Sequence, residues 1–127
     1  LHDVGTSLNP AIDIGQIEGG FIQGVGWLTS EELVWNDKGL LATHAPSTYK
    51  IPATGDVPEH FEIALWHEGN REDNVGGSKA VGEPPFMLAI SAWEALRDAV
   101  AQARGDRRAP LVAPATAENV LKALMST

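Results

Sequence analysis

The chain has 127 residues with 17 acidic and 9 basic side chains, a net charge of −8, and no cysteine. Its length fits one domain or part of a larger one, and a hydrophobic content of 43% is enough for a folded core. Nucleic-acid binding is disfavoured because it needs clustered Lys and Arg. Disulfides, thiolate nucleophiles and iron–sulfur ligation by this chain are excluded. No apolar run reaches the roughly 18–20 residues of a membrane span, so we expect no membrane binding.

The first expected element is a helix that begins at Asn9-Pro10, with Asn9 as N-cap and Pro10 where its missing N–H costs nothing. Apolar residues then recur at helical spacings of three and four, at Ile14, Ile17, Phe21, Val25 and Leu28. Glycines interrupt the same segment, at Gly15, Gly19, Gly20, Gly24 and Gly26. Each costs roughly 0.5–1 kcal/mol relative to Ala inside a helix. They predict a close neighbour, either a tightly packed helix or strand or a large rigid ligand.

The rest of the chain predicts an α+β fold. Residues 31–35 and 40–44 flank a turn that ends in Gly39 and predict a β-hairpin. Residues 61–66 alternate apolar and polar side chains, which is typical of a strand. A long helix is expected to open at Pro84-Pro85 and continue to about Ala103, and a short C-terminal helix to start at Thr116.

The spacing of the histidines and glycines in the sequence argues against two kinds of binding site. The four histidines lack the spacing of a zinc site, so we expect no metal ligands in this chain. The glycine-rich segments lack a P-loop lysine and a correctly spaced dinucleotide motif.

The most specific stretch is Gly76–Pro85, in which Glu83 directly precedes Pro-Pro. A carboxylate at the start of a helix is favoured by the helix dipole, which predicts a capping role. A general base would need the same placement together with a pocket that raises its pKa. The residues themselves leave both interpretations open.

The sequence resembles the C-terminal part of the molybdenum-cofactor-binding portion of the xanthine dehydrogenase/aldehyde oxidase family, and most closely its xanthine dehydrogenases. The resemblance runs from about Asp3 to the last helix and is carried by four segments, residues 3–10, 13–20, 46–52 and 78–85. It implies that residues 1–127 form the C-terminal segment of a molybdenum-cofactor-binding domain and are a fragment of a larger enzyme. The opening at Leu1, without Met, also suggests a processed chain or a fragment.

The resemblance assigns roles residue by residue. Glu83 matches the family's catalytic glutamate, and Gln16 matches a glutamine that hydrogen-bonds the molybdenum–molybdopterin cofactor. Lys79, Ala80, Val81 and Gly82 match backbone that lines the same site. The implied reaction is hydroxylation of an electron-poor carbon of a xanthine- or hypoxanthine-like purine. Glu83 would act as general base on a molybdenum-bound hydroxyl, and hydride would pass to a molybdenum sulfido ligand.

The same resemblance implies a cytoplasmic protein that works with other parts. These are the rest of the molybdenum subunit and the domains or subunits that hold [2Fe–2S] clusters and FAD, none of which this chain binds alone. A homo-oligomer is also expected, and the isolated chain is expected to be inactive. Two alternatives remain: an aldehyde or other N-heterocycle oxidase or dehydrogenase of the same family, and a non-catalytic assembly module.

Overall fold

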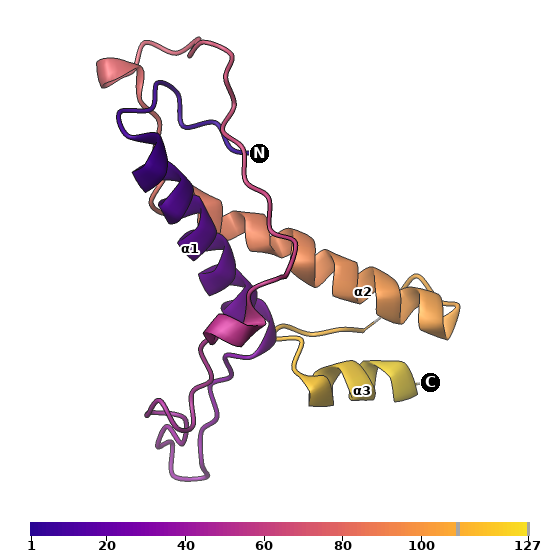
Figure 1. Cartoon of the computed structure of the whole chain (residues 1–127). Coiled ribbons are helices and arrows are strands. Elements are labelled where there is room, and N and C mark those ends of the chain that lie inside the picture. The colour runs from indigo at the N-terminus through magenta and orange to yellow at the C-terminus, as the bar shows by residue number, and fades with distance from the viewer. Residues whose placement is uncertain (109, 127) are drawn as a thin grey trace.

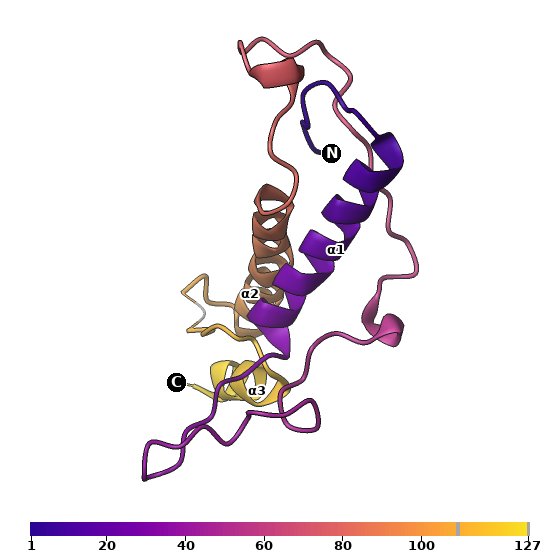
Figure 2. The ribbon, with the colours of Figure 1, turned by 90° about the vertical axis from the view of Figure 1, so that its left-hand side faces the viewer.

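Three helices joined by long extended segments make up the fold, seen in a computed structural model that describes residues 1–108 and 110–126 (Figure 1). Helix α1 spans Pro10–Thr29, α2 spans Ile90–Arg104 and α3 spans Ala117–Met125. Short 3₁₀ turns occupy Thr54–Asp56 (η1), Val75–Gly77 (η2) and Pro84–Ala89 (η3). The η3 turn lies against α1, and α3 lies beside the C-terminal half of α2 (Figures 1 and 2). None of the described helices is long and apolar enough to cross a membrane.

The predicted N-terminal helix and its cap at Asn9 are confirmed. Asn9 is the N-cap, and its side chain accepts a hydrogen bond from the Ile12 N–H. The helix ends at Thr29, and the N–H of the C-cap residue Ser30 donates to the Gly26 carbonyl. Its apolar stripe faces inward, since Ile17 is buried and the other stripe residues are half-buried.

A tightly packed neighbour explains part of the glycine pattern in α1. A Cβ at Gly20 would stand 3.2 Å from the backbone nitrogen of Phe86, and one at Gly24 would stand 2.6 Å from Cβ of Ala89. One at Gly26 would meet Glu31 and Pro52. The neighbours are therefore the η3 turn and the segment after α1.

Two of the α1 glycines have no such neighbour. Gly15 and Gly19 face open space among the described residues. For these two, a close approach by a ligand stays a prediction.

The predicted hairpin and strand are not confirmed as regular strands, because each segment forms only an isolated bridge. In the hairpin region, Trp35 bridges Leu41, and Gly39 adopts the expected positive φ of 74°. The segment 61–66 keeps its alternation of buried and exposed side chains but bridges only through Leu65, to His2. A strand needs a partner along its length, and the described part of this chain supplies no sheet.

The predicted long helix is also divided. It consists of the 3₁₀ turn η3 followed by α2, which ends at the left-handed Gly105 (φ 67°). The short C-terminal helix is confirmed, with the Thr116 side chain as its N-cap.

The buried core is small and divided into two clusters. One lies among the N-terminal segment, α1 and the 61–65 segment, and consists of Val4, Ile17 and Leu65. The other joins α2 to α3 and consists of Val100, Leu111, Ala115 and Ala123. The chain exposes 9081 Å², whereas a compact monomer of this mass exposes roughly 6,500 Å². Much of its surface is therefore of the kind that compact domains bury.

Candidate functional site

The segment that leads to Glu83 crosses the N-terminal segment and is hydrogen-bonded to it. The Lys79 N–H donates to the Val4 carbonyl at 2.9 Å, and the Thr6 N–H donates to the Gly77 carbonyl at 2.7 Å. Gly5 and Gly77 both adopt φ of 65°, and a Cβ at Gly5 would collide with the Gly77 carbonyl. This crossing therefore requires glycine at residue 5 for two reasons, the backbone conformation and the space.

An ion pair closes the same crossing. The Lys79 Nζ lies 2.5 Å from Oδ2 of Asp3, and the Gly5 N–H donates to the other Asp3 oxygen at 2.9 Å. The hydrogen bond from Lys79, with that from Gly5, lowers the pKa of Asp3 below its ordinary value. The Lys79 side chain thus points to the N-terminal segment.

Glu83 occupies the N-cap position of η3, but its side chain caps nothing. The physical reason lies in the next two residues, because Pro84 and Pro85 have no N–H to donate. The first available donor, the Phe86 N–H, bonds the Glu83 backbone carbonyl at 3.0 Å. The capping interpretation of Glu83 is therefore wrong. Its exposed carboxylate also takes part in none of the ion pairs formed within residues 1–108 and 110–126.

Anchors on both sides hold Glu83 in place. On the N-terminal side, Val81 packs against the Val4, Ile17 and Leu65 cluster. On the C-terminal side, Pro85 is fully buried, and Gly20 of α1 lies close to it. Glu83 is therefore an exposed side chain on a backbone that is fixed before and after it.

A hollow of about 920 Å³ opens beside Glu83. One wall is the segment Ala80–Pro84, and the other comes from α1 and η3 through Gln23, Trp27, Phe86 and Met87. The rings of Trp27 and Phe86 meet edge to face, with centroids 4.8 Å apart, which fixes the apolar wall. The arrangement places one carboxylate at the edge of a largely apolar cavity.

The structure brings most of the predicted site residues together, but not all. Ala80, Val81, Gly82 and Glu83 line the hollow, whereas Lys79 and Gln16 do not. Gln16 is exposed on α1, seven residues before Gln23, which is about 10 Å along a helix at 1.5 Å per residue. Spacings of seven residues return to one helix face, so Gln16 lies on the α1 face that borders the hollow.

Sequence reasoning missed the α1 wall. Gln23 and Trp27 stand seven and eleven residues after Gln16, and spacings of 3, 4, 7 and 11 mark one helix face. That signal was present in the sequence, but nothing in it showed which face of α1 meets Glu83.

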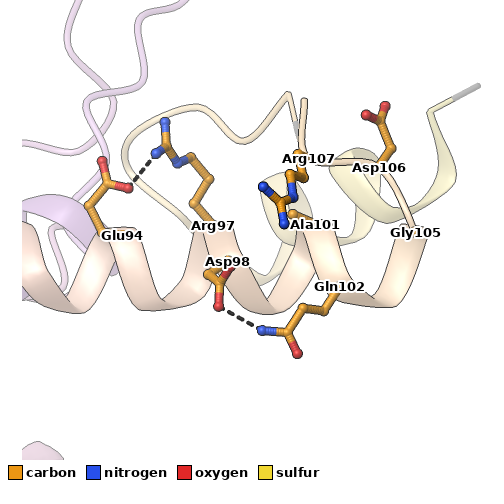
Figure 3. Close-up of a pocket in the computed structure, with 8 residues that line it drawn as sticks. All are labelled: Glu94, Arg97, Asp98, Ala101, Gln102, Gly105, Asp106 and Arg107. Carbon is orange, nitrogen blue, oxygen red and sulfur yellow. Dashed lines mark hydrogen bonds and ion pairs between the residues drawn. The ribbon is translucent and has the colours of Figure 1, made fainter.

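A second hollow, along the C-terminal half of α2, has different chemistry (Figure 3). Glu94 pairs with Arg97 at 2.5 Å, and Gln102 donates to Asp98 at 2.6 Å. These polar groups satisfy one another along one exposed helix, and none of the predicted site residues lies there. Within the described residues, no group of three or more His, Asp or Glu side chains could hold a metal ion.

Comparison with known proteins shows similarity to molybdopterin cofactor-binding proteins. Residues 1–58 match the family of molybdopterin cofactor-binding domains. The fold is similar to that of quinoline 2-oxidoreductase from Pseudomonas putida 86, with a TM-score of 0.79 and 32% identity over 98% of this chain and 15% of that one. A Cu,Mo-CO dehydrogenase shares the fold with a TM-score of 0.78 and 22% identity, covering 98% of this chain and 16% of that one.

Within this class, the chain is similar in sequence to xanthine dehydrogenases. The chain is 48% identical to the xanthine dehydrogenase/oxidase of Gallus gallus and 44% identical to the xanthine dehydrogenase of Oryza sativa subsp. japonica, in each case over all of this chain. It belongs to the xanthine dehydrogenase family and corresponds to a segment of the molybdopterin cofactor-binding region. The chain spans about 10% of the length of these relatives.

Proposed function

We propose that the chain forms part of a molybdenum hydroxylase of the xanthine dehydrogenase type, in which Glu83 is the general base. The observation that carries this proposal is the uncapped carboxylate of Glu83, exposed at the edge of a hollow on a backbone anchored on both sides. A general base must be accessible to the proton that it removes and must be held in place. A carboxylate used for capping would be neither free nor aimed at the hollow.

The residues present fit one side of a molybdopterin cofactor. The consecutive residues Ala80, Val81 and Gly82 line the hollow, and the exposed amide of Gln16 lies on the bordering face of α1. Gly15 and Gly19 flank Gln16, and a Cβ at either glycine would meet none of the described residues within 4 Å. These residues would contact the cofactor from one side, and the opposite side must come from further protein. When bound, the cofactor supplies the two-electron redox chemistry of hydroxylation.

This chain's own part of the reaction is proton transfer. Glu83 accepts, at a carboxylate oxygen, the proton of the water-derived hydroxyl that becomes bonded to the substrate carbon. Trp27, Phe86 and Met87 form the apolar wall beside it. Once further protein covers these exposed side chains, the wall would exclude water and strengthen the charge interactions of the carboxylate.

The large exposed surface supports the proposal that the chain functions within a larger assembly. Many large apolar side chains are exposed, including Trp27, Met87 and Ile90 around η3. Such surface is typical of faces that contact other protein. We propose that the rest of a molybdenum subunit covers it, with iron–sulfur and FAD parts elsewhere in a cytoplasmic enzyme.

The proposed substrate class is xanthine- or hypoxanthine-like purines, in line with the xanthine dehydrogenase relatives. The likeness to quinoline 2-oxidoreductase favours a second candidate, oxidation of another electron-poor N-heterocycle at the same base. Assays with xanthine and with quinoline separate the two.

The test is Glu83→Gln in the full-length protein that carries this chain. We expect molybdenum content to stay the same and turnover to fall on the order of 10²–10⁴-fold or more, because the base is lost. Glu59→Gln, at another exposed carboxylate outside the hollow, is the matched control and should leave turnover unchanged. Near-normal turnover of Glu83→Gln would refute the proposed role.

A further inference from the structure

The ion pair between Asp3 and Lys79 joins residues that are 76 positions apart in the sequence. It lies four residues before Glu83, at the crossing where Lys79 also donates its backbone N–H to Val4. The crossing has two further hydrogen bonds on the Gly77 carbonyl, from the Thr6 N–H at 2.7 Å and from Asn70 Nδ2 at 2.8 Å. The start of the Glu83 segment is therefore fixed to the N-terminal segment by side chain and backbone together.

The downstream anchor of Glu83 does not depend on this pair. Pro85 is buried against α1 through close contact with Gly20 and holds the backbone after Glu83. Between the two anchors, Gly82 and Glu83 are exposed, and a Cβ at Gly82 would meet none of the described residues within 4 Å. Since Gly82 has no packing of its own and the backbone freedom of glycine, the direction of Glu83 depends on how firmly both anchors hold.

We propose that Asp3 and Lys79 are positioning residues for Glu83. The pair sets where the Glu83 carboxylate enters the hollow, and the Lys79 side chain serves this role instead of contacting the cofactor. This inference rests on the proposed function, because only a base at Glu83 requires such positioning. A shift of about 1 Å in a catalytic group can cost on the order of 10²-fold in rate, so even a half-exposed pair can matter here.

The first test is hydrogen exchange in the metal-free full-length protein, which needs no turnover. For Asp3→Asn and Lys79→Met, we expect about two- to fivefold faster exchange in the 77–83 segment, the range set by the modest stability of exposed pairs. The matched control is Lys122→Met, which removes an ion pair of 2.6 Å with Glu118 on α3, away from the crossing. It should leave exchange at 77–83 unchanged.

The second test is the kinetics of the loaded enzyme, expressed per bound molybdenum. Asp3→Asn and Lys79→Met should lower kcat about tenfold with KM within about twofold, because the base is misplaced while the substrate pocket is kept. Lys79→Arg, which retains the cation, should stay near wild type. The exchanged pair Asp3→Lys with Lys79→Asp should recover part of the loss of either single variant.

Two outcomes would overturn the inference. One is unchanged exchange at 77–83 in both single variants. The other is a loss of molybdenum content with normal kcat per molybdenum, which indicates a purely structural pair. A failure of the proposed function is distinguishable from a failure of this inference. If Glu83 is not the base, Glu83→Gln has normal turnover, but the exchange test still shows whether the Asp3–Lys79 pair holds the 77–83 segment.

Discussion

Gly24 of α1 lies so close to Ala89 of η3 that a Cβ at Gly24 would stand 2.6 Å from the Ala89 Cβ. It would also collide with the Phe86 carbonyl. This contact, with that of Gly20, lets the helix that carries Gln16 and Gln23 approach the turn that follows Glu83. The two walls of the hollow are thus brought together by the absence of side chains on α1.

Gly24→Ala should therefore push η3 away from α1. We expect a local destabilisation of about 1–3 kcal/mol, the range for overpacking a tight interface, measured as faster hydrogen exchange of the η3 and α1 amides in the full-length protein. The matched control is Gly19→Ala in the same helix, with both variants measured in the cofactor-free protein, because a Cβ at Gly19 meets none of the described residues within 4 Å. That change should stabilise α1 by about 0.5–1 kcal/mol. Equal behaviour of the two variants would contradict the close packing.

The Asp3–Lys79 pair should weaken in acid. The pKa of Asp3 is lowered in the folded chain. The ionised carboxylate is therefore favoured by folding, and the ion pair stabilises the folded chain at pH values above 3.8, the ordinary pKa of Asp3. That stabilisation is lost as the pH falls from 3.8 through the lower, folded pKa.

Hydrogen exchange at residues 77–83, corrected for its intrinsic pH dependence, checks this between about pH 6 and about pH 3. In the wild type, protection at 77–83 should fall in the acidic part of the range. In Asp3→Asn it should start lower and show no such fall. A parallel loss in both proteins would assign the acid sensitivity to other groups.

Arg104 should hold α3 onto α2. Its Nη1 donates to the Ala123 carbonyl at 2.6 Å and to Ser126 Oγ at 2.8 Å, and its side chain is only 13% exposed. Arg104→Met should destabilise the docking of α3 by about 1.5–3 kcal/mol, the range for hydrogen bonds to charged groups. Arg107→Met, at an exposed arginine, should change it by less than about 0.5 kcal/mol. Limited proteolysis after α2 distinguishes the two.

The α1 and α3 helices were predictable because their signals are local. Asn9-Pro10 and Thr116 start them through contacts within three residues, and the apolar stripe of α1 needs only its own period. The uncapped state of Glu83 was readable in the same way, since two prolines remove the nearest donors. The helix dipole favours a carboxylate at this position, but it supplies no N–H group for the side chain to accept from.

The predicted strands were not confirmed because a strand, unlike a helix, depends on contacts outside its own segment. Alternation at 61–66 correctly gave which side chains are buried, but a strand is completed only by a partner, and residues 1–108 and 110–126 offer His2 alone. The family resemblance gave Glu83 its candidate role, whereas the choice of Gln23 and Trp27 as the opposite wall required the contact of α1 with η3.

The sequence by itself thus determined the helix starts and the inward face of α1, both of which depend on residues a few positions apart. Only the tertiary structure decided that Lys79 pairs with Asp3 and that the α1 glycines receive η3. These contacts join segments about 60 to 76 residues apart. The sequence carries no local signal for such pairings, because segments so distant in the chain meet only when the intervening elements have packed.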